Sequence, residues 1–333
     1  MTTVTTSFRT TRSANDLLRR AWGFSPLLTL AGLANLLLIP AFIVALLVDP
    51  RVITGVPAWI KPLKFAISIA IFSATFIWLL TFVQGHARLV KLAAGITGLG
   101  LLVETALIIM QVLRGTTSHF NVSTPFDAVV FSLMGGFISA VSVCTLLLAI
   151  LLIRQRLPDL VFAWSLRLGV LISFVGMTVA FLMTMPTGAQ LDAAQAGARM
   201  TLSGAHSVGL GDGGPGLPLL GWSTVGGDLR VPHFFGLHAL QVLPLIGGLL
   251  SLDWTRRRLS ERQRLALVWT AGLGYLGLVL LLTWQALRGQ SIVAPDALTL
   301  TAFAALIGVA ALAASVTLLA SRVTAASGLS QLS

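Results

Sequence analysis

Long apolar stretches separated by short polar segments run through almost the whole chain. Eight stretches reach the roughly 20 apolar residues that a helix needs to cross a bilayer. They cover residues 25–48, 59–83, 92–113, 128–153, 161–186, 232–252, 265–287 and 297–320. They lack the strict alternation of transmembrane β-strands. The pattern therefore predicts an all-α integral membrane protein with eight transmembrane helices.

The composition supports this reading. Of 333 residues, 56% are hydrophobic and 10% are charged, whereas a soluble globular chain carries about 25% charged residues. So few charged side chains cannot cover a protein of this size in water, which excludes a soluble enzyme and a disordered chain. The first apolar stretch is too long for a signal-peptide core, so we interpret it as a retained helix. The single cysteine, Cys144, allows no intrachain disulfide.

The basic residues indicate how the chain crosses the membrane. Fourteen Lys and Arg residues fall on one side, in the N-terminal segment, the 84–91, 154–160 and 253–264 loops and the tail, and seven fall on the other. Because cytoplasmic loops carry the excess of Lys and Arg, both termini are expected in the cytoplasm. The protein is then a multi-pass protein of the plasma (cytoplasmic) membrane. Its net charge of +11 reflects this topology, and no nucleic-acid partner is implied.

A polar motif occurs twice at a constant spacing. Residues 107–116 read LIIMQVLRGT and residues 281–290 read LLTWQALRGQ, which aligns Gln111 and Arg114 with Gln285 and Arg288. Each copy contains four predicted helices, an even number, so the copies form a parallel repeat. We predict two four-helix halves, residues 25–156 and 157–322. A cytoplasmic segment, 1–24, precedes them, and a cytoplasmic tail, 323–333, follows them.

The second half contains an insertion. Residues 187–231 form a 45-residue extracytoplasmic loop with eleven glycines. Loops of this length without structure of their own are uncommon in compact domains. We therefore expect a folded, Gly-rich lid over the outer face, with a short amphipathic helix near 189–199.

Polar and ionisable residues gather toward the outer side. Such groups are costly at membrane depth and usually face an interior cavity. The sequence thus predicts an outward-facing polar pocket between the two halves, covered by the lid. The residues concerned are Lys61, Lys64, Gln111, Arg114, His119, Asn121, Asp127, His206, Asp212, Asp228, Arg230, His233, His238, Gln241, Gln285, Arg288 and Asp296.

Glu104 is the one acidic residue deep in a predicted helix. An intramembrane carboxylate is a functional hypothesis by default, here as a proton relay or a ligand charge. The alternative is a protonated or paired carboxyl group that fixes helix packing. Arg114 and Arg288 end their helices as anion clamps or, alternatively, as partners of headgroups and terminal carbonyls. The candidate catalytic residues are Glu104, Gln111, Arg114, Gln285 and Arg288.

Two aspartates and four histidines complete the candidates. Asp127 and Asp296 are expected to cap the fourth and eighth helices rather than to act as acids. The histidines indicate an unidentified cofactor, haem or a transition metal, or else neutral side chains that are hydrogen-bonded in a polar mouth. The candidate metal ligands are His119, His206, His233 and His238, and the candidate cofactor-binding residues are His233, His238, Gln241 and Lys64.

Three segments carry a resemblance to known proteins. WIKPLKFA (59–66), QVLRGTTSHFN (111–121) and GWSTVGGDLRVPHFFGLHALQ (221–241) resemble a bacterial family of eight-helix integral membrane proteins, over roughly residues 20–320. A looser similarity is to haem A synthase, which also has two four-helix halves, and it implies a cofactor between helices. That family places paired histidines on the even-numbered helices. Here the fourth and eighth helices have none, and the second has lysines instead.

Three functions fit these features. The first is a membrane-embedded redox or haem- or metal-binding enzyme that uses the outward-facing pocket. The second is a secondary transporter or permease, and the third is an extracytoplasmic sensor or assembly factor. Because transport sites usually lie at the midplane, the outer position of the polar cluster favours the enzyme. The ligand is an unidentified small molecule, and no lysine follows a glycine as a Walker nucleotide motif requires.

Overall fold

The structure, a computed structural model, describes residues 14–329. The chain is mostly helical (72%), and eight of the described helices are long and apolar enough to cross a membrane. This confirms the prediction of an all-α, multi-pass membrane protein. The eight helices are α2 (Pro26–Val48), α3 (Ile60–Leu80), α4 (Ala87–Leu113), α5 (Pro125–Arg154), α6 (Leu160–Thr184), α8 (Arg230–Leu250), α10 (Glu261–Leu287) and α11 (Ala297–Leu329). The predictions for residues 1–13 and 330–333 lie outside the described residues.

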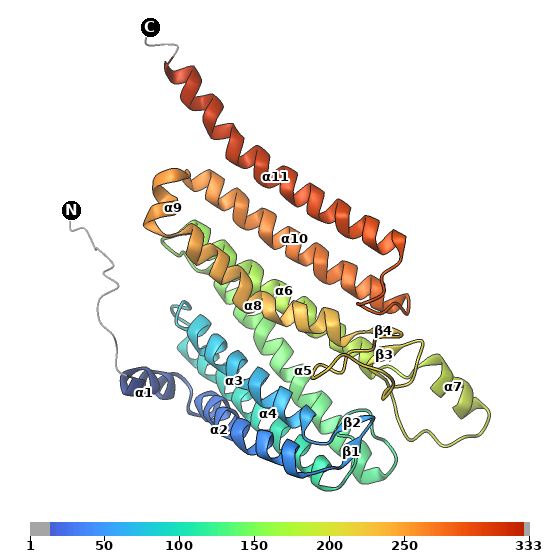
Figure 1. The fold of residues 1–333 in the computed structure, drawn as a ribbon. Coiled ribbons are helices and arrows are strands. Elements are labelled where there is room, and N and C mark those ends of the chain that lie inside the picture. Colours follow the sequence, from blue (N-terminus) through green and yellow to red (C-terminus); the bar gives the residue numbers. More distant parts are fainter. Residues whose placement is uncertain (1–13, 330–333) are drawn as a thin grey trace.

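Several short elements join the long helices. Three are helices, α1 (Ala14–Phe24), α7 (Gly188–Gln195) and α9 (Asp253–Arg258). Strands β1 (Val52–Ile53) and β2 (Val56–Pro57) form one antiparallel pair, and β3 (Ser207–Val208) and β4 (Gly227–Asp228) form another. Figure 1 shows both pairs and α7 at one end of the bundle, called the hairpin end below. The opposite end, with α1 and α9, is called the basic end.

Polar caps move several helix starts away from the limits of the apolar stretches. The fourth long helix begins at Pro125, because the hydroxyl of Thr124 accepts a hydrogen bond from the Asp127 N–H (3.1 Å). The predicted cap at Asp127 is therefore wrong. Asp296 does cap α11, since it accepts from the Thr299 N–H at 2.8 Å. Ser260 opens α10 with a capping box, ahead of the apolar stretch at 265.

The long helices pack in two groups. In the first group α2 contacts α3 and α4, and α4 contacts α3 and α5; in the second, α6 contacts α8 and α10, α8 contacts α10, and α10 contacts α11. The contact between α5 and α6 joins the groups. Figure 1 shows α11 at the edge of the bundle against α10, and its apolar window is not buried inside the protein.

Glycines set the close approach of α6 and α8. A Cβ atom on Gly236 would lie 2.4 Å from the Cα atom of Gly176. A Cβ atom on Gly169 would lie 2.9 Å from the carbonyl oxygen of Ala239. These contacts involve backbone, which cannot move aside cheaply. Small residues at such crossings let helices approach closely in a membrane, where van der Waals packing drives association.

The segment between α6 and α8, residues 185–229, is folded over the hairpin end. The Ser203 N–H donates to the Phe120 carbonyl (2.8 Å), and the Ala205 N–H donates to the Met183 carbonyl (2.9 Å). Met183 belongs to α6 of the second group, and the loop after α10 adds another contact to that group, since the Ser291 hydroxyl donates to the Ser223 carbonyl at 2.8 Å. The segment thereby contacts both groups of helices. Its helix α7 begins with a Thr187 capping box and overlaps the first part of the amphipathic helix expected near 189–199, although none of its residues is buried.

Candidate functional site

A buried acid–histidine pair lies where α4 meets the loop after it. Glu104 is 1% exposed, and its Oε1 lies 3.3 Å from Nε2 of His119. Neither carboxyl oxygen of Glu104 has a hydrogen-bond partner among the described residues. On the other side of the ring, Nδ1 of His119 lies 2.9 Å from the Ser118 hydroxyl. The two residues were predicted separately, and folding brings them together.

Burial and the nearby charge of Lys61 hold the pKa of His119 below its ordinary value, and the contact with Glu104 opposes this shift. The shift favours the neutral form of the histidine. If the Ser118 hydroxyl donates to Nδ1, the ring carries its proton on Nε2, toward the carboxyl group. Phe120, next in the chain, has a left-handed backbone (φ +66°). Such backbone outliers in bulky residues cluster at functional sites.

Lys61 connects this pair to a second one. It lies in the first turn of α3 and interacts electrostatically with Glu104 and Asp212. It also lies close enough to His119 and His206 to affect both rings. We call Lys61, Glu104, His119, His206 and Asp212 the ionisable cluster. Its members come from α3, α4, the 114–124 loop and the 185–229 segment.

The second pair joins His206 to Asp212. Nδ1 of His206 lies 2.6 Å from Oδ2 of Asp212, and the same carboxylate accepts the backbone N–H groups of His206 and Ser207. The His206 ring packs edge-on against Phe120, with centroids 4.8 Å apart. Burial lowers the pKa of His206 to about 4, although Asp212 opposes the shift; the charges of Lys61 and Arg230 lower it further.

This shift predicts an acid-sensitive stability. Because the pKa of His206 falls from 6.5 to about 4 on folding, the unfolded chain takes up the proton first as the pH drops. The free energy of unfolding therefore decreases from about pH 6.5 to about pH 4, and this component then levels off. Burial alone would raise the pKa of Asp212, but His206 holds it below its usual range. Protonation of Asp212 therefore affects the free energy of unfolding only below this pH window.

Thermal unfolding of the purified protein across this pH range measures the effect. His206→Gln should flatten the decline, whereas His86→Gln, at an exposed histidine of the basic end, should leave it as in the wild type. An unchanged slope in His206→Gln would show that another group causes the acid sensitivity.

The remaining predicted histidines do not join the cluster through hydrogen bonds. Nδ1 of His233 lies 2.8 Å from the Gly176 carbonyl, and Nδ1 of His238 lies 2.8 Å from the Phe234 carbonyl. The Gln241 amide donates to Thr75 on α3 at 3.1 Å. Among residues 14–329, no group of three or more His, Cys, Asp and Glu side chains is placed to hold a metal ion. The metal and haem assignments stay predictions.

The two QxLRG motifs form similar clasps between consecutive helices. Arg114 pairs with Asp127 at 2.6 Å, and the buried Gln111 amide donates to the same carboxylate at 3.0 Å. Arg288 pairs with Asp296 at 2.6 Å, while the Gln285 amide donates to the Ser291 carbonyl. Both guanidinium groups thus already have a carboxylate partner. The geometry favours helix pairing over the anion clamp that the sequence also allowed.

The two clasps should differ in strength. Asp127→Ala leaves the buried Gln111 amide unpaired and should cost about 1–3 kcal/mol of unfolding free energy. Asp296→Ala removes a carboxylate that is 39% exposed, so solvent already screens its ion pair, and the smaller loss should come mainly from the missing cap of α11. Unfolding of both variants in one detergent measures the difference. Equal losses would contradict the buried role of Asp127.

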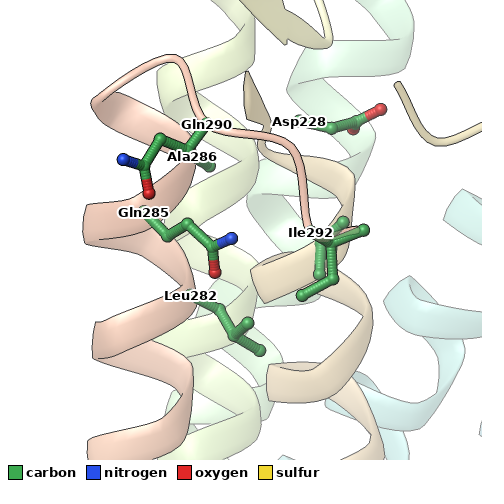
Figure 2. A pocket seen from close by; sticks show the side chains of 7 residues that line it. Asp228, Leu282, Gln285, Ala286, Gln290 and Ile292 are labelled. Carbon is green, nitrogen blue, oxygen red and sulfur yellow. The ribbon is translucent and has the colours of Figure 1, made fainter. Parts of the chain in front are cut away.

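A small cavity lies at the hairpin end. The best-defined cavity holds about 10 Å³, roughly the space for one water molecule. Figure 2 shows its lining, where the Gln285 side chain points from α10 toward the loop that carries Ile292. Asp228 contributes to the same wall. Of the residues predicted to line a polar pocket, Asp228 and Gln285 line this cavity.

Comparison with protein-family models, with curated proteins and with solved structures gives no match. The fold defines a multi-pass, all-α membrane protein, and its function has to be argued from the site itself. The resemblances to the bacterial family and to haem A synthase stay predictions.

Proposed function

We propose that this protein is a proton-coupled permease, in which the Glu104–His119 pair binds and releases the coupling proton. The observation that carries the proposal is the burial of Glu104 at 1% exposure, with a histidine nitrogen 3.3 Å away. Such a carboxyl group is expensive in a membrane helix, where ionisable residues mark proton relays and solute pathways.

The depth of Glu104 supports transport over the enzyme hypothesis. Glu104 lies nine residues before the end of α4 at Leu113, which places it about 14 Å from the helix end. Half of the hydrocarbon core is about 15 Å thick. The carboxyl group thus lies inside a spanning helix, about a third of the length of α4 from its hairpin end, and ionisable groups at such depth mark solute pathways.

The helix packing supports a parallel repeat as the moving framework. The first and second helices of each predicted half contact each other, as do the first and third, the second and third, and the third and fourth. The two arginine clasps, Arg114–Asp127 and Arg288–Asp296, occupy matching positions. We propose that the halves rock against each other and expose the ionisable cluster alternately to the two sides.

In this proposal the 185–229 segment is an extracytoplasmic lid. The asymmetry of basic residues supports an extracytoplasmic hairpin end with cytoplasmic termini in the plasma membrane. The segment's hydrogen bonds to both helix groups support a closed outer gate. Opening that gate requires these bonds to break.

Proton movement in proteoliposomes tests the function. Liposomes with a pH-sensitive dye inside receive a panel of carboxylates, phosphate, amino acids and sugars, one at a time. At least one solute should acidify the interior faster with the wild-type protein than in empty liposomes. If no solute in any of these classes moves protons beyond the empty-liposome rate, the permease proposal is contradicted.

One observation favours a second function, an outward-facing acid–base enzyme. Asp212 holds His206 through Nδ1 at 2.6 Å, as a carboxylate orients the histidine of a general-base pair. Substrate turnover without net transport, lost in His206→Gln but retained in Glu104→Gln, would support this alternative over the permease.

A further inference from the structure

Two cationic side chains meet beneath the tip of the 185–229 segment, residues 219–221, and a third lies close enough to interact with both. Nζ of Lys64 donates to the Leu220 carbonyl at 2.8 Å. Arg230 donates to the neighbouring Gly221 carbonyl at 2.5 Å. Lys64 comes from α3 in the first helix group and Arg230 from α8 in the second. Lys61 interacts electrostatically with both of them.

Within residues 14–329 the two lysines make no direct ion pair, although Lys61 interacts electrostatically with Glu104 and Asp212, and Lys64 with Asp228. Arg230 is paired with Asp228 through two nitrogens, at 2.9 and 2.5 Å. Within residues 14–329, Lys64 has no carboxylate at ion-pair distance, and Lys61 has neither an ion pair nor a side-chain hydrogen bond. Like charges that share a partly buried site repel one another, and an anion bound directly to the two lysines would offset this repulsion.

The tip itself has a strained backbone. Leu219 adopts a left-handed conformation (φ +63°), as does Gly221 (φ +67°). Leu219 is 75% exposed, so side-chain packing does not hold it in place. For a residue other than glycine, such a conformation is strained and is found at ligand clamps and switch regions.

From this geometry we infer that Lys61, Lys64 and Arg230 form the binding site for a small anion, a carboxylate or a phosphate. The Leu220 and Gly221 carbonyl oxygens occupy the positions of the anion's oxygens while the tip is closed. When the tip lifts, two anion oxygens replace the carbonyls on Lys64 and Arg230, and Lys61 adds a third contact. The N-termini of α3 and α8 lie at the same place, and their dipoles favour negative charge there.

This inference rests on the proposed function, because it names the class of solute that the permease would carry with its proton. The site lies at the start of α3, and Lys61 interacts with Glu104. Binding of the anion next to Lys61 would therefore favour protonation of the cluster. A proton and an anion would then cross together.

Stabilisation by anions tests the site in the full-length protein. Its thermal midpoint in neutral detergent is titrated with inorganic phosphate, and separately with acetate, against chloride at equal ionic strength. Phosphate or acetate should raise the midpoint more than chloride does. Lys64→Gln should weaken the apparent affinity about tenfold or more, as loss of a charged hydrogen bond does.

Two further lysine variants keep the result interpretable. Lys61→Gln removes no hydrogen bond or ion pair seen within the described chain, so it should fold normally and still weaken anion binding. Lys91→Gln, at the only other lysine and exposed at the basic end, should bind like the wild type. The inference is overturned if neither anion exceeds chloride, or if Lys61→Gln and Lys64→Gln respond as the wild type does.

A lipid headgroup could supply the same phosphate chemistry. The titration is therefore repeated in nanodiscs of phosphatidylcholine alone and of phosphatidylcholine with phosphatidylglycerol. A phosphate response that persists in both supports a free anion, and one that phosphatidylglycerol abolishes assigns the site to a lipid. Anion binding without proton movement in proteoliposomes would keep the site and reject the permease. Proton movement driven only by neutral solutes would keep the permease and reject the anion site.

Discussion

Replacing Glu104 by Gln is expected to abolish solute-driven proton uptake in proteoliposomes. The substitution keeps the size of the side chain and removes the group that exchanges the proton beside His119. Removal of a positioned acid–base group typically costs a factor of about 10² to 10⁴ in rate, so the initial rate should fall about a hundredfold or more. The dye-loaded liposomes described above measure it.

The chain offers a matched control for this variant. Glu261, the only other glutamate in the sequence, is exposed in the first turn of α10. Glu261→Gln should transport at the wild-type rate. Wild-type proton uptake by Glu104→Gln, in protein of normal thermal stability, would reduce Glu104 to a role in helix packing.

The second large effect concerns stability. Gly236→Ala is expected to lower the free energy of unfolding by about 1–3 kcal/mol, as overpacking does. The added Cβ atom would lie 2.4 Å from the Cα atom of Gly176, so α6 and α8 must separate along their contact. Unfolding by sodium dodecyl sulfate in mixed micelles measures the loss.

A different glycine separates packing from helix propensity. In α5, a Cβ atom on Gly135 would meet nothing within 4 Å. Gly135→Ala should therefore be neutral or stabilising by about 0.5–1 kcal/mol, because alanine favours the helix. If Gly236→Ala is as stable as the wild type, the close approach of α6 and α8 is not needed for the fold.

The apolar pattern was sufficient to predict the eight long helices, because a spanning helix needs a long apolar run. It placed their ends less well, since caps such as Thr124 and Ser260 and the charged first turn of α10 lie outside such runs. The strand pair β1–β2 was missed. Two-residue strands are too short to show hydrophobic periodicity. The turn between them also contacts a distant segment, since the backbone of Gly55 packs closely against that of Gly213.

The candidate site was predicted in part. Glu104 was identifiable because a carboxyl group in a membrane helix is rare. Its pairing with His119 was not, because it depends on how the 114–124 loop folds back toward α4. The His206–Asp212 pair depends likewise on the fold of the 185–229 segment. Arg114 had the residue type of an anion clamp, but its partner Asp127 becomes visible only in three dimensions.

The central claim is that Glu104 takes up and releases a proton inside the membrane. Infrared difference spectroscopy of the reconstituted protein during a pH titration tests it most directly, because a protonated carboxylic acid has its own carbonyl-stretch band. The account predicts a distinct band of a carboxylic acid that is shielded from water, beside the bands of the exposed carboxyl groups; it appears on acidification in the wild type and in Glu261→Gln, and is missing in Glu104→Gln. The same band at the same intensity in Glu104→Gln would contradict it.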